Sequence, residues 1–252
     1  MEKSKRKYEI LKSEGFRVEV EYENMGFKPI HKALYRIRAL RDITADVKAG
    51  DIGGFVESEN NLSHEGDCWI YNDARVYENA NVRDNAKIYN NAVISGNAEI
   101  FGNCFIYDNV HISDCVKVFD DATVEDNVMI WGAAKIFGNA RITGYARIRD
   151  YASVYGYARI QGKVNLSNSC IIRDNVIVTD SSDIYGDAKI QNGAVVDGSS
   201  RIFGRANIYG SSYISSSKIS GDVKVCGRSK ITNCIISGKH NICNKTYKDK
   251  KM

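Results

Sequence analysis

The side chains best suited to acid–base chemistry in this chain of 252 residues are four histidines, His31, His64, His111 and His240. A histidine can serve as a general base because its ordinary pKa lies near neutral pH. Three of the four lie outside the regular repeat described below. His111 lies within it, with no inserted loop nearby to close a pocket over the side chain. We therefore interpret His111 as a solvated surface residue and assign no catalytic residue.

The seven cysteines are the other reactive side chains, and none of them forms a CxxC pair. Cys68, Cys104 and Cys170 fall at a repeat position that Ala, Val or Ser otherwise fills, which favours reduced core thiols over metal or disulfide roles. Aspartates recur at corner positions with Asn and Gly as equivalents, so turn geometry explains them without a cation. No GxGxxG or GxxxxGK[ST] motif is present. We expect neither a metal site nor a cofactor.

A six-residue repeat must position these residues. From Ile70 to Ile214 every sixth residue is Val or Ile, with Leu166 as the one exception, and the unit reads [VI]-x-[GND]-x-[AVCS]-x. β-branched residues suit strands, and Gly, Asn and Asp tolerate the positive φ of tight corners. A helix cannot keep such residues on one face, because its period is 3.6. The repeat predicts an all-β solenoid in which short parallel strands stack into about 10 coils.

The two ends of the chain lack the regular repeat. Residues 1–65 alternate in polarity at 16–22 and 33–40, which predicts two or three antiparallel strands that cap the first coil. Residues 66–243 form the predicted solenoid, although its register slips by one residue after Ile214 and again after Ile231. Residues 244–252 are predicted to be a disordered basic tail.

Composition limits the location and the partners of the chain. Hydrophobic residues make up 43% and charged residues 26%, and the formal net charge is only +4. This is a soluble mixture with no strong bias toward nucleic acid. No apolar run approaches the roughly 20 residues needed to cross a bilayer. We expect a cytoplasmic protein that does not contact a membrane.

The repeat is similar to that of the hexapeptide-repeat proteins, which form left-handed parallel β-helices with three hexapeptides per coil. The stretch at 47–74, VKAGDIGGFVESENNLSHEGDCWIYNDA, resembles the first segment of the YdcK-like proteins of enterobacteria, phages and prophages. The resemblance implies a left-handed helix and a nominal kinship with acyltransferases, but it supplies no catalytic residues. In an acyl-CoA-dependent transferase of this kind, His111 or His64 would be the general base near a subunit boundary.

Outward side chains can be compared once about 18 residues are taken as one coil, because residues one coil apart then stack. Phe101, Phe119, Phe137 and Tyr155 form such a column directly after their anchors. An exposed apolar stripe several coils long is typical of a contact surface, with self-association as the default. An aromatic ladder can equally stabilise a stack of parallel strands or lie under the N-terminal segment. The sequence leaves both interpretations open.

A cluster of basic residues is the second outward feature. Between positions 131 and 175, seven basic residues stand against two acidic ones. The seven are Lys135, Arg141, Arg147, Arg149, Arg159, Lys163 and Arg173. They are a candidate site for a nucleic-acid backbone or an acidic protein surface, and Tyr145, Tyr151 and Tyr157 in the same region could stack on bases. A solvated polar wall is the interpretation that we favour.

These observations favour a non-catalytic scaffold that binds a protein partner through its outward side chains, with a homo-oligomer as one form of that binding. The resemblance to phage and prophage proteins suggests an accessory factor that inhibits a host protein such as a defence nuclease. The alternatives are an acyl-CoA-dependent acyltransferase and a nucleic-acid-binding rod.

Overall fold

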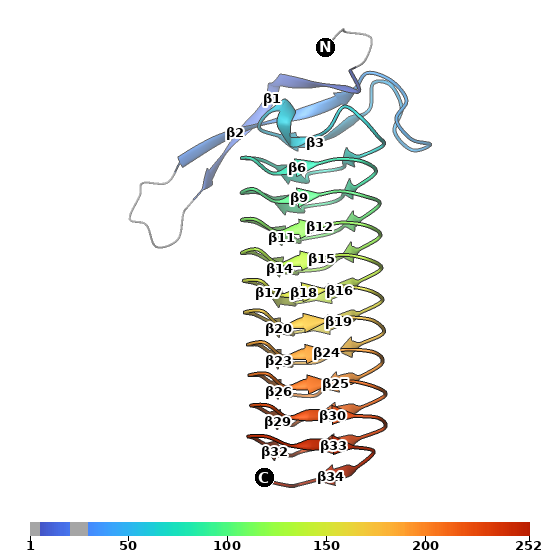
Figure 1. The fold of residues 1–252 in the computed structure, drawn as a ribbon. Helices are drawn as coiled ribbons and strands as arrows, with labels where there is room; N and C mark the ends of the chain where they lie inside the picture. The colour runs from blue at the N-terminus through green and yellow to red at the C-terminus, as the bar shows by residue number, and fades with distance from the viewer. Residues whose placement is uncertain (1–5, 21–29) are drawn as a thin grey trace.

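The computed structural model describes residues 6–20 and 30–252, which form a rod of stacked turns below a small N-terminal cap (Figure 1). Three sheets run along the rod and contain 13, 11 and 10 strands. The 3-10 turn Glu59–Asn61 is the only helical segment among the described residues, and none of them forms a helix able to cross a membrane. The predicted all-β parallel solenoid is confirmed. Its 11-stranded sheet takes one strand from each turn, which makes about eleven turns rather than ten.

The sheets are numbered from the largest to the smallest, and each contains every third strand of the solenoid. Sheet 1 contains β1 (Tyr8–Val20), β2 (Ile30–Ala39), β3 (Ile52–Val56), β5 (Arg75–Val76), β8 (Val93–Ile94), β11 (His111–Ile112), β14 (Met129–Ile130), β17 (Arg147–Ile148), β20 (Asn165–Leu166), β23 (Asp183–Ile184), β26 (Arg201–Ile202), β29 (Lys218–Ile219) and β32 (Ile235–Ile236). Sheet 2 contains β4 (Trp69–Ile70), β7 (Lys87–Ile88), β10 (Phe105–Ile106), β13 (Thr123–Val124), β16 (Arg141–Gly144), β19 (Arg159–Gly162), β22 (Ile177–Val178), β25 (Val195–Asp197), β28 (Tyr213–Ser215), β31 (Lys230–Thr232) and β34 (Thr246–Lys248). Sheet 3 contains β6 (Asn81–Val82), β9 (Glu99–Ile100), β12 (Lys117–Val118), β15 (Lys135–Ile136), β18 (Ser153–Val154), β21 (Ile171–Ile172), β24 (Lys189–Ile190), β27 (Asn207–Ile208), β30 (Lys224–Cys226) and β33 (Asn241–Cys243).

Consecutive turns stack in parallel, and 18 residues separate the partners over most of the rod. Phe105 in β10 pairs with Thr123 in β13, and Ile106 pairs with Val124. The second residue of each two-residue strand points inward and is buried, as is the small residue that precedes the strand. The core is therefore a continuous column of mainly Val, Ile and Ala side chains, and the burial of their apolar surface stabilises the stack.

The corners between strands take residues with positive φ. Asp120 and Gly138, one turn apart, have φ values of 59° and 69°. The Asp120 carboxylate also accepts a hydrogen bond from the backbone N–H of Gly138 at 3.1 Å, and Asp150 accepts one from Asn168 at 2.9 Å. Corner aspartates therefore tolerate the left-handed conformation and also tie adjacent turns together.

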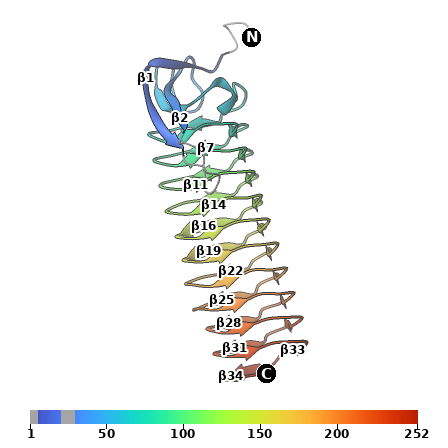
Figure 2. The same cartoon turned by 90° about the vertical axis from the view of Figure 1, so that its left-hand side faces the viewer.

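The cap continues sheet 1 beyond the solenoid. β1 and β2 form an antiparallel hairpin, β3 is antiparallel to β2, and β3 then pairs in parallel with β5. The antiparallel strands expected from the sequence are present, although β1 begins earlier than predicted, at Tyr8, and residues 21–22 of the predicted segment lie outside the described residues. Both views show the hairpin at one end of the rod and to one side of it (Figures 1 and 2).

Side chains of the cap supply hydrogen-bond donors to the first turn. Many backbone N–H groups of one turn donate to carbonyls of the next, so the first turn presents carbonyl oxygens to the cap. Buried Lys7 Nζ donates to three of these oxygens in the segment 65–68, at 2.9 to 3.3 Å. The Asn61 amide donates to the carbonyls of Glu78 and Ala80 at 3.0 and 2.9 Å. The cap thus satisfies polar groups that the first turn would otherwise bury without partners.

The last turns are shorter by one residue. Arg201 pairs with Lys218, and Lys218 pairs with Ile235, so 17 residues separate these partners. The change occurs where the sequence register slips. The prediction of a disordered tail at 244–252 is wrong, because β34 pairs in parallel with β31 and Tyr247 packs against the core.

The cysteines divide into two groups. Cys68, Cys104 and Cys170 are buried free thiols in the core column, as expected. Cys226 and Cys243 are register partners in β30 and β33, with Cα atoms 4.5 Å apart, and they form a disulfide. The sequence analysis makes no prediction for this pair, which forms because the 17-residue turn places the two side chains directly above one another.

Candidate interaction surface

An aromatic ladder runs along sheet 3. Phe101, Phe119, Phe137 and Tyr155 directly follow β9, β12, β15 and β18, and successive ring centroids are 5.0, 4.8 and 4.6 Å apart. The ring planes lie within 8° of parallel. This spacing matches the strand separation of about 4.8 Å, so the backbone sets it. The structure thus brings the predicted column together, with each ring half-buried.

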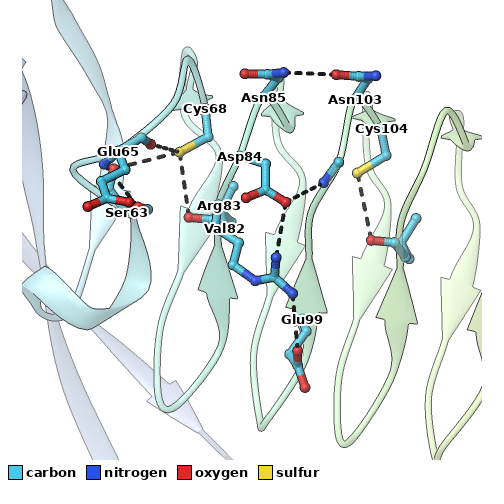
Figure 3. Close-up of polar contacts among 12 residues, drawn as sticks. Ser63, Glu65, Cys68, Val82, Arg83, Asp84, Asn85, Glu99, Asn103 and Cys104 are labelled. Atoms are coloured by element: carbon cyan, nitrogen blue, oxygen red, sulfur yellow. Dashed lines mark hydrogen bonds and ion pairs between the residues drawn. The ribbon is translucent and has the colours of Figure 1, made fainter.

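Charged side chains close the ladder at the end nearer the cap. The guanidinium of Arg83 lies over the Phe101 ring at 3.8 Å from its centroid. Glu99 pairs with both Arg83, at 3.7 Å, and Lys117, at 2.6 Å. Figure 3 shows Arg83 directed toward Glu99 and also toward Asp84, its neighbour in the chain. These contacts hold both cations beside the ladder, where Arg83 covers the first ring.

Two exposed tyrosines widen the other end of the ladder. Tyr151 and Tyr157 occupy the corners on either side of β18, with 71% and 62% of their surface exposed. Tyr155 lies between them in the sequence and is half-buried. We call Phe101, Phe119, Phe137, Tyr151, Tyr155 and Tyr157 the aromatic face. The third corner of this turn carries Tyr145, 60% exposed, between sheets 2 and 1, so it does not border sheet 3.

A second ladder lies on sheet 2, and its first ring meets the cap. Tyr71, Tyr89 and Tyr107 stack on sheet 2, with centroids 4.2 and 4.8 Å apart. The Tyr71 hydroxyl donates to Asp46 of the cap at 3.2 Å. The hairpin itself extends sheet 1, where Phe16 packs edge-on against an aromatic ring of β3. Together with the bridge between Leu62 and Val82 of β6, these contacts place the described residues of the cap over the first strands of all three sheets, and none of these contacts involves a ring of the sheet 3 ladder.

The seven basic residues of the predicted patch are spread over all three sheets. Sheet 2 and the corner that follows it carry Arg141, Arg159 and Lys163; sheet 1 carries Arg147 and Arg149; sheet 3 carries Lys135 and Arg173. Arg141 pairs with Glu125 at 2.7 Å, and Arg149 and Arg173 lie 3.5 and 3.7 Å from neighbouring aspartates. The structure therefore does not unite the seven into one patch, and only Lys135 and Arg173 accompany the aromatic face.

The two histidines considered for general-base chemistry lie far apart in the fold. His111 is exposed on β11 of sheet 1. His64 stacks on Tyr8 with centroids 4.4 Å apart, and its Nδ1 accepts the backbone N–H of Lys7 at 3.3 Å. Burial lowers the pKa of His64, which favours its neutral form. Neither histidine has a nucleophile and an orienting carboxylate arranged around it in the described part of the chain.

Metal chemistry finds no support in the described residues, where no group of three or more His, Cys, Asp or Glu could hold an ion.

The sequence interpretation did miss one feature, the flanking of Tyr155 by Tyr151 and Tyr157 on the same face. The six-residue unit could have predicted it. The exposed corner residue, here Tyr151, comes two positions before the strand begins, and the next corner residue, Tyr157, comes two positions after Tyr155. The tyrosines had instead been grouped with the basic residues by their nearness in sequence.

Comparison with known proteins adds no assignment to these features. No protein-family model matches the chain, and no curated protein is significantly similar to it.

Proposed function

We propose that this protein is a non-catalytic scaffold that binds a protein partner through the aromatic face. The observation that carries the proposal is a continuous ladder of four half-buried rings with two strongly exposed tyrosines beside its last member. Tyrosine and phenylalanine are enriched in the cores of protein interfaces. The solenoid below them is a stiff support, so little conformational entropy is lost when a partner docks.

The charge of the face suggests the kind of partner. Lys135 is exposed beside the ladder, and no described residue forms an ion pair with it. Arg173 continues the ladder column after Tyr155 and donates from Nε to Gln191 at 2.9 Å. A partner surface that is apolar at its centre and acidic at its rim fits these side chains. A second copy of the chain is the default partner to test, since symmetric homo-oligomers are common.

A finer proposal rests on the resemblance to phage and prophage proteins. In that case the partner is a host protein, such as a defence nuclease, and docking of the rod inhibits it. The scattered histidines and the divided basic residues favour this binding role over acyl transfer or nucleic-acid binding.

The first test is the solution mass by light scattering for the wild-type chain and for Phe119→Glu/Phe137→Glu. Glutamate suits this repeat position, since Glu125 follows its anchor in the same way on sheet 2. Phe203→Glu is the matched control, because Phe203 stacks on Tyr185 at 4.7 Å on sheet 1. An oligomer that dissociates in the double variant but not in the control supports self-association through the aromatic face.

If the wild-type chain is a monomer, site-specific photocrosslinking identifies the partner surface. A photoreactive phenylalanine at position 155 should crosslink a defined host protein, and the same residue at position 203 should not. Equal crosslinking from both positions would contradict a role for the aromatic face. An unchanged oligomer in the double variant would contradict self-association through it.

A further inference from the structure

A recess of about 350 Å³ opens beside the last strands of sheet 1, on the side of the corner that follows sheet 2. Its lining comes from four successive corners, the last of them after β34, and from the strands β26, β29 and β32 that follow the first three. The polar lining residues include Ser199, Ser216 and Asn233, and the charged ones include Arg201, Lys218, Asp249, Lys250 and Lys251. The recess lies outside the aromatic face, which occupies sheet 3.

The missing residue of the short turns explains the recess. In an 18-residue turn, an exposed residue stands between the positive-φ corner residue and the small inward one. Ser199 has this place after Gly198. In the next turn Ser216 has positive φ and the buried Ser217 follows it directly, so the exposed residue is absent. The exposed corner residue is also absent after Asn233, where buried Cys234 follows directly. The surface next to Ser199 in the following turns therefore lies closer to the axis of the rod, which leaves the recess.

Four basic residues line this recess, and among them Arg201 alone is paired with an acid in the part of the chain that the structure describes. Arg201 and Lys218 are register partners, and Arg201 pairs with Asp183 at 3.3 Å. Lys218 Nζ lies 5.5 Å from the Phe203 ring centroid, and Lys250 Nζ lies 4.4 Å from that of Tyr247.

The unmatched charge is carried by three lysines. Among the described residues, no ion pair involves Lys218, Lys250 or Lys251. The one acid of the lining, Asp249, accepts a hydrogen bond from the Asn233 amide. The recess is therefore lined by three lysines that have no ion-pair partner among the described residues and by one carboxylate that is already engaged.

Two other register pairs of cations in the rod also have one member paired with an acid, as Arg201 is with Asp183, but the recess adds Lys250 and Lys251 to its pair. Lys117 and Lys135 are register partners, but Glu99 neutralises Lys117 at 2.6 Å. Arg141 and Arg159 are likewise partners, and Glu125 neutralises Arg141 at 2.7 Å. Ammonium groups gathered in a concave site repel one another unless an anion lies among them.

We propose that the recess binds a small ligand through a phosphate group. The ammonium groups of Lys218, Lys250 and Lys251 supply charge, and the hydroxyls of Ser199 and Ser216 supply neutral donors suited to phosphate oxygens. Its volume is at the low end of the range for small-molecule sites, which fits a phosphomonoester or a diphosphate. The site does not depend on the aromatic face, so it can be tested separately.

The test uses inorganic phosphate and pyrophosphate as probes, with binding followed by calorimetry and by amide chemical shifts. We expect saturable binding, stronger for pyrophosphate, with shifts centred on residues 199–201, 216–218 and 249–251. Lys218→Gln/Lys250→Gln should weaken binding about tenfold or more, because charge-assisted hydrogen bonds to phosphate are lost. The matched control is Lys189→Gln/Lys224→Gln, which removes the same charge from exposed positions on sheet 3.

A second variant changes the shape of the recess and keeps its charges. Insertion of one Asn between Ser216 and Ser217 restores the exposed corner residue, which is Asn at the corresponding places after Asn90 and Asp108. The insertion should abolish saturable binding while the circular dichroism spectrum stays that of the wild type. Absence of pyrophosphate binding to the wild-type chain would overturn the proposal. Equal weakening by both lysine pairs would also overturn it, because general surface charge would then explain the binding.

Double-stranded DNA serves as the competing ligand class. If it binds more tightly than pyrophosphate and the Lys189→Gln/Lys224→Gln control weakens it as much as the recess variant does, the lysines act as a general nucleic-acid surface. That outcome contradicts a small phosphate site. Tighter binding of pyrophosphate that only the recess variants remove supports it.

Discussion

The first and last turns of the rod stack in the same way but close their corners differently. In the first turns each corner keeps an exposed residue. Where this residue is asparagine in two successive turns, the two side chains form a hydrogen bond, as Asn85 does with Asn103 at 2.9 Å (Figure 3). In the last turns that residue is missing from the corners that precede β29 and β32. Strand pairing continues in both regions, so the exposed corner residue is not needed for stacking. It is free to be a tyrosine, as at Tyr151 and Tyr157, or to be absent and leave a recess.

The two regions also differ in how their outermost turns are held. Side chains of the cap, above all Lys7 and Asn61, donate to the carbonyls of the first turn. The last turns are joined by the Cys226–Cys243 disulfide. One region thus depends on hydrogen bonds across a buried surface, and the other on a covalent bond. The following substitutions separate these two contributions.

The largest effect is expected at Lys7. Lys7→Met leaves three carbonyl oxygens in the segment 65–68 without their donor, which should lower the free energy of unfolding by about 3 kcal/mol. Urea denaturation measures the change. Lys12→Met is the control, because Lys12 is an exposed lysine of the same cap. A loss below a few tenths of a kcal/mol for Lys7→Met would mean that water replaces the ammonium group.

The disulfide should come second, with an effect confined to the last turns. Cys226→Ser opens a loop of 17 residues, and the chain-entropy model assigns about 3 kcal/mol to a loop of this size. We expect faster amide hydrogen exchange in β33 and β34 and unchanged exchange in β6 and β9. Cys115→Ser, at an exposed free thiol, is the control. Uniformly faster exchange along the whole rod would show that the turns unfold as one unit.

The sequence predicted most of the fold because a six-residue period admits few structures. The anchors from Ile70 onward, the positive-φ corners and the register slips all follow from that one pattern. The tail was missed because its lysines hide Tyr247, a single apolar residue at an anchor position. The Cys226–Cys243 pair was also visible in principle, since the two positions are 17 residues apart and the slipped turns have that length.

The candidate sites were harder to predict, for a geometric reason. The aromatic ladder was found because stacking depends only on the 18-residue turn. The basic residues were grouped by sequence distance, but a segment longer than two turns visits every sheet, so Arg147 and Arg159 lie on different faces. The recess depends on a residue that is absent; the register slips mark its place in the sequence, but they do not show which side chains line the space that it leaves.

A smaller effect is expected at a regular corner. Asp120→Ala loses the hydrogen bond to the Gly138 N–H and places alanine at φ 59°, which should cost about 1 to 2 kcal/mol. Asp120→Gly removes the bond but tolerates the conformation, so it should cost less. Thermal denaturation of the two variants separates the contributions. Equal losses would assign the whole effect to the hydrogen bond.

The smallest effect is a dependence on pH at the cap. Burial lowers the pKa of His64 below the 6.5 of an unfolded histidine, so the unfolded chain binds more protons between the two values. Stability should therefore be full above pH 6.5 and should decline as the pH falls through the folded-state pKa. His64→Asn, whose Oδ1 can replace Nδ1 as acceptor for the Lys7 N–H, should flatten this decline between pH 5 and 7.5 in urea denaturation. An equally steep decline in the variant would assign the effect to another group, such as His111, whose pKa is also lowered, first by partial desolvation of its ring against the wall of sheet 1 and then by the charge of Arg75.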